Sequence, residues 1–337
     1  MSGPCRATSH RHATPPQPGL GRTVRRCRGR SAAQAQRGVA LLAALLAVAL
    51  AAVLFAALLD TGETIRARTR NALRAEQTWQ LARGMELWAE SALKRDLQSS
   101  EGFDARGEGW GQPIPPIPIP GGSVTGLLRD GSGCLNLNDL VEQGVEQPQR
   151  IERFRRLIEV LQLDPAIADA VVDWIDADVS PHPEGAEDLT YLGMNPAYRA
   201  ANRPMAHPSE LRRVYRVDDA AYRALRPHIC TWPQPSPINL NFASPQLWRA
   251  LDPEITAAMA ATLWRDGQAN FRNTHDVDQE LRRLIGRPVA LQDVSTASEW
   301  FVLEAEVQVD GLPFRYAAVI RRHPRQVETV IRLRGQW

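Results

Sequence analysis

Residues 39–59 read VALLAALLAVALAAVLFAALL and contain no charged side chain and no hydroxyl group. At 1.5 Å per residue a helix of this length extends about 31 Å, and the hydrocarbon core of a bilayer is about 30 Å thick. Ala and Leu dominate the stretch, and both favour helix. The sequence therefore predicts one transmembrane helix over 39–59, between Gly38 and Asp60.

The helical pattern continues beyond the apolar stretch. From Ile65 to Leu97 there is no proline, and Gly84 is the only glycine. Several residues recur at helical rather than alternating spacing, namely Leu73, Gln77, Leu81, Leu87 and Trp88. We expect a single helix over 39–98, apolar all round in its first half and amphipathic in its second.

Residues 1–38 form a basic leader with eight arginines and no acidic residue. The positive-inside rule keeps such a flank in the cytoplasm, so the bulk of the chain is expected in the periplasm, behind a single-pass inner-membrane anchor. Of the 40 basic residues, 32 remain after the leader against 38 acidic residues, which leaves a formal charge of −6. The overall charge of +2 is therefore no argument for nucleic-acid binding.

Two other kinds of N-terminus share this pattern. A secretory signal peptide usually has an apolar region of about 7–15 residues followed by an A-x-A-like cleavage site, and no good site follows Leu59. An uncleaved signal anchor is the plainer alternative and stays open at this point.

Residues 99–137 are expected to hold a loop and the first strands of a small sheet domain. The segment 99–122 is rich in Gly and Pro, which ends the helix and predicts a loop. Its IPPIPIP run favours extended or polyproline structure, and an ordered crossover against the sheet is preferred to a ligand for a proline-recognition groove. Asp130-Gly131 then predicts a hairpin between two short strands within 123–137.

Residues 138–290 are expected to form an inserted α-helical domain. Helices are predicted over 151–161, 165–175, 209–215, 218–225 and 254–264, and a further helix is expected to begin at Pro245. Asp164 and Ser244 are the expected N-caps, each before a proline. Residues 291–337 return to strands: 301–309 and 314–321 flank Asp310-Gly311, and 327–333 follows. Alternating side chains predict an antiparallel meander with one solvated face. The fold class is therefore α+β, with sheet strands on both sides of a helical insert.

An acidic segment is the best candidate for a binding site. Asp173, Asp176 and Asp178 precede Glu184, Glu187 and Asp188, and the Pro and Gly residues between them predict a loop. Crowded carboxylates repel one another unless a hard cation neutralises them, and calcium takes six to eight oxygen ligands from flexible loops. The spacing is not that of an EF-hand. A solvated acidic loop with helix caps is the alternative.

Only two of the four cysteines, Cys134 and Cys230, lie outside the leader. A pair of cysteines in an oxidising compartment suggests one disulfide, with two buried thiols as the alternative. The histidines are scattered, and no zinc, phosphate-loop or nucleophile-elbow motif is present, so no enzyme is expected.

Residues 237–273 resemble a helix-hairpin-helix or SAM-like unit, a class that includes DNA-binding modules. The expected hairpin, 251–256, is acidic and has no glycine, so phosphate binding by its backbone amides is disfavoured. A helical protein-interaction fold is preferred, and no nucleic-acid partner is expected.

Gly38, followed by Val39 and a long apolar helix, resembles the N-terminus of type IV prepilins and type II secretion pseudopilins. The resemblance implies that a prepilin peptidase cuts after Gly38 and methylates the new N-terminus at Val39. Most members carry a glutamate at the fifth mature position, which pairs with the buried N-terminus of a neighbouring subunit. Here that position is Ala43, which suits the end of a filament because it offers no such pairing.

The long helical insert and several short motifs make the chain similar to one minor pseudopilin family, GspK (general secretion pathway protein K). The motifs are Gly133–Asn138 (GCLNLN), Asp173–Asp178 (DWIDAD), Gly185–Asp188 (GAED) with Tyr191, Asn202–Met205 (NRPM) with Glu210-Leu211, and Pro237–Asn241 (PINLN). Each motif alone is weak, but their order along the chain is specific.

This resemblance implies a non-enzymatic subunit that caps the tip of the type II secretion pseudopilus. Its expected partners are the minor pseudopilins I and J, with H as a further candidate. A pilin-like periplasmic protein of a type IV pilus or DNA-uptake system is the alternative. The resemblance also implies calcium in the helical insert, with six expected ligands: Asp176, Asp178, Glu187, Asp188, Asp173 and Asn202.

Overall fold

In the computed structural model, residues 32–99 and 102–335 are described, and they belong to two compact units divided after Arg70. The helix α1 (Ala32–Ser99) contains the whole segment predicted as helix. In the first unit its apolar side chains from Val39 to Leu59 are exposed, with a mean hydropathy of 2.9 in the most apolar window. This helix is long and apolar enough to cross a membrane.

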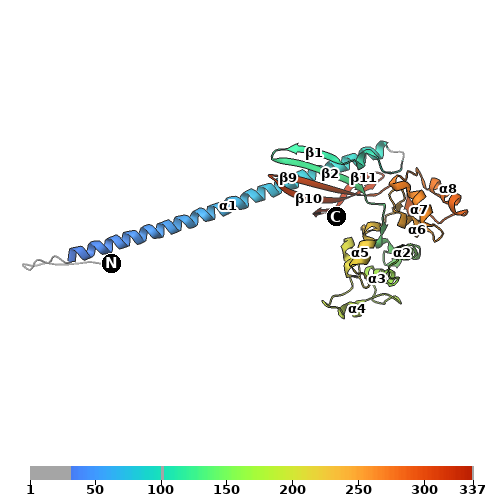
Figure 1. Cartoon of the computed structure of the whole chain (residues 1–337), viewed down its shortest axis with the longest axis horizontal. Coiled ribbons are helices and arrows are strands. Elements are labelled where there is room, and N and C mark those ends of the chain that lie inside the picture. The colour runs from blue at the N-terminus through green and yellow to red at the C-terminus, as the bar shows by residue number, and fades with distance from the viewer. Residues whose placement is uncertain (1–31, 100–101, 336–337) are drawn as a thin grey trace, which may run out of the picture. The chain divides into compact units, whose positions relative to one another are not determined.

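The second unit contains a five-stranded antiparallel sheet in the order β1-β2-β9-β10-β11. Its strands are β1 (Ile114–Ile119), β2 (Gly122–Asp130), β9 (Trp300–Val309), β10 (Leu312–His323) and β11 (Gln326–Arg334). The predicted C-terminal meander is confirmed, with left-handed backbone at Asp310 and Gly311 in its first turn. Strands from the beginning and the end of this unit, cyan and red in Figure 1, thus lie side by side.

The last six turns of α1 pack on one face of this sheet. The buried positions Ala82, Met85, Ala89 and Leu93 recur at intervals of three and four residues, as one face of a helix requires. They contact apolar side chains of alternate sheet positions, including Leu128, Leu303 and Ala318. The amphipathic half of the helix thus packs on the chain's own sheet, although burial begins only at Thr78.

An ion pair between a buried carboxylate and an exposed arginine fixes the helix against the edge strand β11. Glu86 is 1% exposed and accepts hydrogen bonds from Arg332 at 2.6 and 2.9 Å and from the hydroxyl of Tyr316 at 2.5 Å. Burial alone raises the pKa of Glu86, but the bonds from Arg332 and Tyr316 outweigh that effect, and its pKa lies below the ordinary value. The carboxylate therefore stays charged where it is buried.

Two expectations for the segment before the insert were wrong. Residues 114–119 were expected to be part of a loop, but they form the edge strand β1, where prolines are tolerated because one side of the strand needs no donors. Asp130-Gly131 is not a hairpin: β2 ends there, and the Gly131 amide donates to the Trp300 carbonyl at 2.8 Å. The short strand β3 (Leu135–Asn136) pairs with β6 (Ile229–Cys230) instead of the sheet.

The insert therefore runs from 131 to 299, longer at both ends than the predicted 138–290, and it leaves and re-enters the sheet between the neighbouring strands β2 and β9. Trp232 stacks on Trp300 with 5.4 Å between ring centroids. Beside them, Cys134 and Cys230 form a disulfide. These contacts tie the beginning of the insert, at Cys134, and its middle, at Cys230 and Trp232, to the sheet at Trp300.

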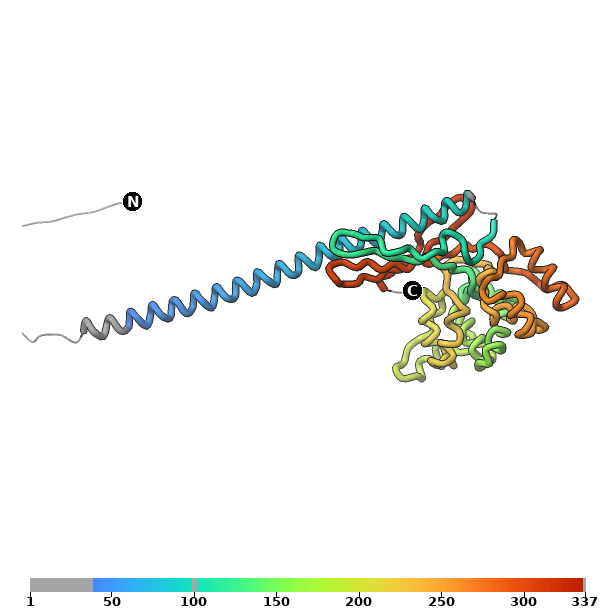
Figure 2. Tube along the Cα trace, turned by 45° about the horizontal axis from the view of Figure 1, so that its top comes forward, coloured from blue at the N-terminus to red at the C-terminus, as the bar shows by residue number. Residues whose placement is uncertain are grey.

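The insert is mainly helical and has its own core (Figure 2). Its helices are α2 (Pro148–Val160), α3 (Ala166–Ile175), α4 (Asp188–Leu192), α5 (Asp219–Leu225), α6 (Pro245–Leu251), α7 (Ala257–Trp264) and α8 (Thr274–Ile285), with 3-10 turns at Leu137–Leu140, Pro208–Arg213, Arg226–His228 and Arg265–Gly267. A further 3-10 turn, Gly109–Gly111, lies outside the insert, before β1. The short strands β4 (Val141–Glu142), β5 (Val145–Glu146), β7 (Ile238–Asn239) and β8 (Val294–Ser295) complete it. The helices α4 and α8 were not predicted from the sequence.

The insert consists of two helical modules with the same plan, which was not predicted from the sequence. Each opens with a short strand in a parallel pair, β3 with β6 and β7 with β8, and each strand leads into a pair of helices. In the first module, Asn138 accepts a hydrogen bond from the amide of Met205 at 2.7 Å and donates one to its carbonyl at 3.0 Å. In the second, Asn241 bonds both groups of Phe271 at 2.7 and 2.9 Å. Each asparagine thus closes its module in the same way.

The disulfide between Cys134 and Cys230 closes a loop with a sequence separation of 96. Replacing both residues by serine should lower the free energy of unfolding by up to about 4–5 kcal/mol, because the unfolded chain then regains the entropy of an open loop. Denaturant unfolding of the full chain in detergent, followed by tryptophan fluorescence, measures this change.

The wild-type chain unfolded with a thiol reductant present is the matched control and should lose the same amount. If neither treatment moves the unfolding midpoint, the link contributes nothing to the stability of the insert.

Candidate metal centre

The carboxylates of the acidic segment are positioned by the end of α3 and the beginning of α4. All ten residues of α3 are buried, and Asp176 follows as its C-cap, with its amide bonded to the Val172 carbonyl at 2.9 Å. Glu187 is the N-cap of α4, and its carbonyl accepts the amides of Thr190 and Tyr191. Two fixed helix ends therefore hold two buried carboxylates of the segment, Asp176 and Glu187.

Asp176, Asp178 and Glu187 lie together, each with a carboxylate oxygen within 4.8 Å of the others. Asp176 and Glu187 are each 5% exposed, and Asp178 is exposed. Asp176 Oδ1 and both carboxylate oxygens of Glu187 are buried without a hydrogen-bond partner. Such atoms are rare in folded proteins because each loses its hydration, so they indicate a missing positive charge.

Asn202 adds a neutral oxygen to this set. Its amide nitrogen donates to the Asp178 carbonyl at 2.8 Å, which places the side chain beside the cluster. Its Oδ1 atom is also buried without a partner. The backbone at Asn202 is left-handed, with φ of 44°, a conformation that asparagine adopts more readily than most residues. Three carboxylates and one amide oxygen match the ligands that calcium prefers.

The electrostatics of the cluster agree with this interpretation. Burial, followed by repulsion from Asp178 and Asp173, raises the pKa of Asp176 to about 6. Burial, followed by repulsion from Asp176 and Asp173, raises the pKa of Glu187 to about 7. One pKa unit corresponds to about 1.4 kcal/mol, so ionising both groups without a counter-ion costs several kcal/mol. A bound dication would remove this cost.

The remaining two expected ligands have other roles. Asp173 is fully buried and accepts the amides of Ala186 at 2.7 Å and His182 at 3.2 Å, together with the His182 ring at 2.5 Å. A side chain at Gly185 would place its Cβ 1.9 Å from Asp173 Oδ2, so this glycine allows the loop to fold over the carboxylate. Asp188 points elsewhere, to the Ala200 amide at 3.1 Å and to Arg199 at 3.3 Å.

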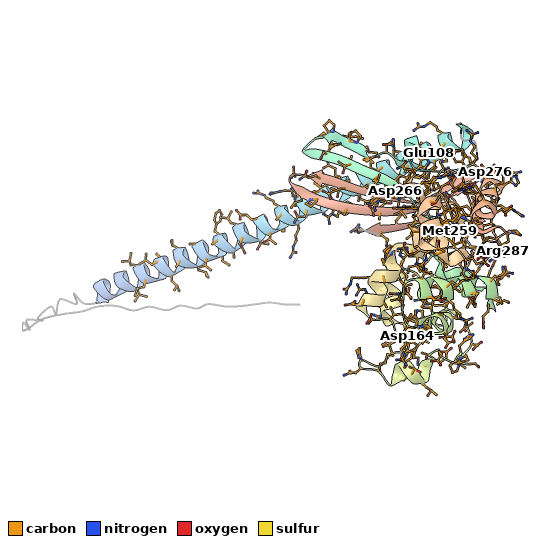
Figure 3. The ribbon with its side chains drawn as sticks, turned by 45° about the vertical axis from the view of Figure 1, so that its right-hand side comes forward. Glu108, Asp164, Met259, Asp266, Asp276 and Arg287 are labelled. Carbon is orange, nitrogen blue, oxygen red and sulfur yellow. A yellow bond between two sulfur atoms is a disulfide. The ribbon has the colours of Figure 1, made fainter. Side chains whose placement is uncertain are left out.

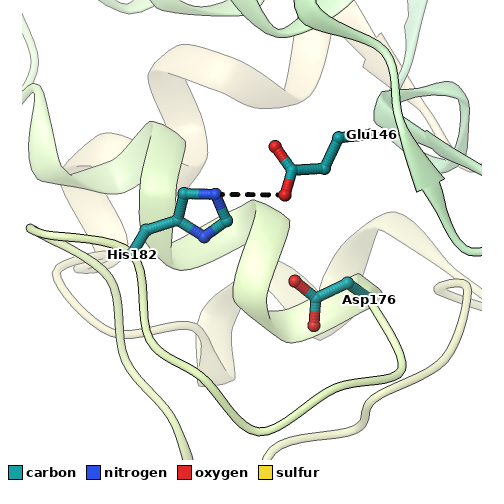
Figure 4. Close-up of side chains that lie close together, drawn as sticks. All are labelled: Glu146, Asp176 and His182. Carbon is teal, nitrogen blue, oxygen red and sulfur yellow. Dashed lines mark ion pairs between the residues drawn. The ribbon is translucent and has the colours of Figure 1, made fainter.

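Of the six expected ligands, the structure thus brings together Asp176, Asp178 and Glu187, with Asn202 beside them. It uses Asp173 to shape the loop and Asp188 to hold the following segment. Sequence reasoning missed the role of His182, whose ring lies between Asp173 and Glu146. Figure 4 shows its ion pair with Glu146. The proximity of Asp173 and His182 in the chain was the available signal.

The hairpin of the second helical unit, 251–256, differs from a phosphate-binding hairpin. The amides of Glu254 and Ile255 are bonded to Asp252, at 3.0 and 3.1 Å. Arg287, labelled in Figure 3, forms ion pairs with Asp252 at 2.8 Å and with Glu254 at 3.0 Å. These bonds occupy the amides that a DNA-binding hairpin would offer to a phosphate.

Comparison with known proteins identifies the family. A family model described as type II secretion system (T2SS), protein K, matches residues 133–234, the range of the first helical unit. Type II secretion system protein K of Pseudomonas aeruginosa is 34% identical over 286 residues, which cover 81% of this chain and 85% of that protein. Type II secretion system protein K of Pectobacterium carotovorum is 32% identical and covers 90% of this chain and 97% of its own length.

The solved structures agree. A chain of the GspK-GspI-GspJ complex from enterotoxigenic Escherichia coli has a TM-score of 0.69 and 25% identity, and the match covers 80% of this chain and all of that one. The fold is therefore the expected α+β class, with a pilin-like N-terminal helix on an antiparallel sheet and a large helical insert. This chain belongs to the type II secretion system protein K family and is a membrane-anchored minor pseudopilin.

Proposed function

We propose that this pseudopilin caps the tip of the type II secretion pseudopilus and supports export across the outer membrane without enzymatic activity. The observation that carries the proposal is the 131–299 insert, which enters and leaves the sheet between β2 and β9. A unit with its own core at that place leaves little room for another subunit stacked above it. Ala43 points the same way because it lacks the carboxylate by which the usual subunit pairs with a neighbour.

The proposal places the chain in the inner membrane through residues 39–59, with residues 60–337 in the periplasm and the basic leader in the cytoplasm. Prepilin peptidase would cut between Gly38 and Val39 and methylate the new N-terminus. The similar solved structure is a complex of GspK with GspI and GspJ, which supports minor pseudopilins I and J as the neighbours of this chain, with H as a further candidate. These neighbours would contact the amphipathic half of α1, on the side that does not face its own sheet.

Calcium is the cation that we propose for the cluster of Asp176, Asp178, Glu187 and Asn202. When bound, it would supply a fixed double positive charge. The chain's residues then do the structural work: α3 and α4 present the two buried carboxylates, and Asn202 connects the segment 193–207 to them. The expected result is an ordered connection between α3 and the 3-10 turn at Pro208–Arg213.

The tip position predicts where the subunit lies in a filament. In cells that overproduce pseudopili, gold-labelled antibody against a C-terminal tag should mark one end of each filament. The reason is that a subunit with a bulky insert and no carboxylate at 43 can occupy the end of a filament but cannot hold a further subunit beyond itself. Electron microscopy of sheared filaments measures this distribution.

A tagged major pseudopilin, labelled along the whole filament, is the control. Mass spectrometry of the same filaments should find this chain beginning at N-methylated Val39. Gold along the full length would contradict the tip position, and a chain that keeps residues 1–38 would contradict processing.

Calcium binding predicts a stability change that depends on Glu187. For the full chain in detergent, calcium at about one hundred times its dissociation constant should stabilise the fold by about 2.7 kcal/mol and raise the melting temperature by about 5–10 °C. Glu187→Gln should abolish most of this shift, because it removes one buried ligand charge.

The matched control is Asp188→Asn, which changes the adjacent carboxylate whose partners are Ala200 and Arg199. It should keep the calcium shift. Equal shifts in the wild type and Glu187→Gln would rule out this cluster as the calcium site.

The raised pKa values of Asp176, to about 6, and Glu187, to about 7, predict that calcium binding depends on pH. Below pH 6 both groups hold protons that calcium must displace, whereas above pH 7.5 both are ionised before binding. Isothermal titration calorimetry should therefore give a tighter dissociation constant at pH 8 than at pH 5.5, with proton release that fades as the pH rises. An affinity that is constant across this range would contradict the assignment.

A further inference from the structure

The second unit contains a cavity of about 720 Å³ that has no part in the proposed calcium site. It lies where three parts of the chain meet: the segment 105–111 before β1, the end of β2 at 127–130, and the insert around Cys134 and Cys230. Ligand pockets in proteins have volumes of about 300–1,000 Å³. The cavity is therefore large enough for a short segment of another chain.

One wall of this cavity is the open edge of β2. The strand β1 pairs with residues 122–126 of β2 only, and the chain before Ile114 forms the 3-10 turn Gly109–Gly111 instead of continuing the strand. No strand of the described chain pairs with this side of β2 at 127–130. An unpaired strand edge is a template to which another strand can add.

The register of the sheet shows which backbone groups this edge presents. The Gly131 amide donates to the Trp300 carbonyl at 2.8 Å, and β2 and β9 pair without a register shift up to this bond. Antiparallel strands alternate between residues that bond to the neighbour and residues whose amides and carbonyls face away from it. Gly131 and every second residue before it thus face β9. Leu128 and Asp130 therefore present their amides and carbonyls to the open side.

Three arginines line the cavity, and two of them have no acidic partner. Arg129 forms an ion pair with Glu304 at 2.9 Å. Arg106, which is exposed, and Arg226, which is half-buried at the end of α5, form no ion pair with any residue that the structure describes. The other carboxylate at the cavity, Asp130, already accepts hydrogen bonds from within the fold. Two guanidinium groups thus lack a counter-ion, and they favour a partner with negative charge.

Aromatic side chains give the cavity fixed apolar walls. Trp110 and Trp232 are 5% and 2% exposed, and Phe242 packs against Trp110 with 6.0 Å between ring centroids. Cys134 of the disulfide also lines the cavity and is half-buried. Walls that are held by the core and by a disulfide do not have to be ordered by a ligand, which lowers the free-energy cost of binding.

We propose that this cavity binds an extended acidic segment of a partner protein, which adds as a short strand to β2 at 127–130. Leu128 and Asp130 supply the main-chain hydrogen bonds, and Arg106 and Arg226 bind carboxylates of the segment. Side chains of an extended segment alternate in direction, so acidic residues two apart point to one side and the apolar residues between them to the other. The inference does not depend on the tip position or on calcium.

The test uses a fluorescein-labelled hexapeptide of alternating glutamate and valine as the probe, with the full chain in detergent and detergent alone as the blank. Fluorescence anisotropy should give a dissociation constant below about 1 mM. Raising the salt concentration to about 0.5 M should weaken binding at least about threefold, because salt screens the contacts with the arginines.

Two variants change the cavity in different ways. Arg226→Glu replaces attraction by repulsion and should weaken binding at least about tenfold. Gly111→Trp should weaken it as much by filling the space, and the backbone accepts a side chain there because a Cβ at Gly111 meets no atom within 4 Å. The matched control is Arg223→Glu, one turn earlier on α5 and outside the cavity, which should bind the probe as the wild type does.

The disulfide locates the bound probe independently of these variants. Because Cys134 lines the cavity, a saturating amount of the probe should slow the reduction of the Cys134–Cys230 link by dithiothreitol at least about threefold. Two further peptides are the ligand controls: the same hexapeptide N-methylated throughout, which has no amide donors, and one with lysine in place of glutamate. Neither should bind.

Three results would overturn the proposal. The first is no binding of the glutamate–valine probe below about 1 mM. The second is wild-type affinity in both Arg226→Glu and Gly111→Trp with an unchanged rate of disulfide reduction, which would place the probe elsewhere. The third is equal binding of the N-methylated or the lysine peptide, which would make the cavity an unselective apolar cleft.

Discussion

The pairing of β2 with β9 is the constraint on which the rest of the second unit depends. The two strands are neighbours in the sheet, yet residues 131–299 lie between them in the chain. Whatever the insert contains, its first and last residues must therefore meet within a few ångströms. The Gly131–Trp300 backbone bond, the stacked Trp232 and Trp300 rings and the Cys134–Cys230 link all lie at this meeting point. The pilin-like core can thus close as though the insert were a short loop.

Within the insert, the order of the acidic loop is a matter of charge rather than of apolar burial. Few apolar side chains hold residues 176–188 in place, and Val179 and Leu189 are exposed at 70% and 91%. The loop is held instead by the amides of His182 and Ala186, which converge on the Asp173 carboxylate. Hydrogen bonds to a buried carboxylate stabilise a loop only while every polar group of the network has a partner.

Local patterns predicted much of this structure. Uninterrupted helical spacing gave α1, and alternation with the Asp310-Gly311 turn gave the meander. Prediction failed where a distant partner decides the outcome: β1 contains three prolines but gains an edge position from β2, and Gly131 bonds to Trp300 rather than turning. In the site, Glu187 and Asp188 are adjacent carboxylates that the sequence alone does not distinguish. Successive side chains at the start of a helix point in directions about 100° apart around the helix axis. One faces the cluster and the other faces Arg199. The matching roles of Asn138 and Asn241 were hidden because their partners lie 67 and 30 residues away.

The repeated plan of the insert has a consequence for how the acidic loop should be regarded. The two modules of the insert differ greatly in the connection that joins their second helix to the backbone held by the asparagine. In the first module this connection is residues 176–204, and in the second it is residues 265–270. The second module of the insert closes over this short connection with no acidic loop. The architecture itself thus has no intrinsic need of an ion. The acidic loop is therefore an elaboration confined to one of two modules that share a plan.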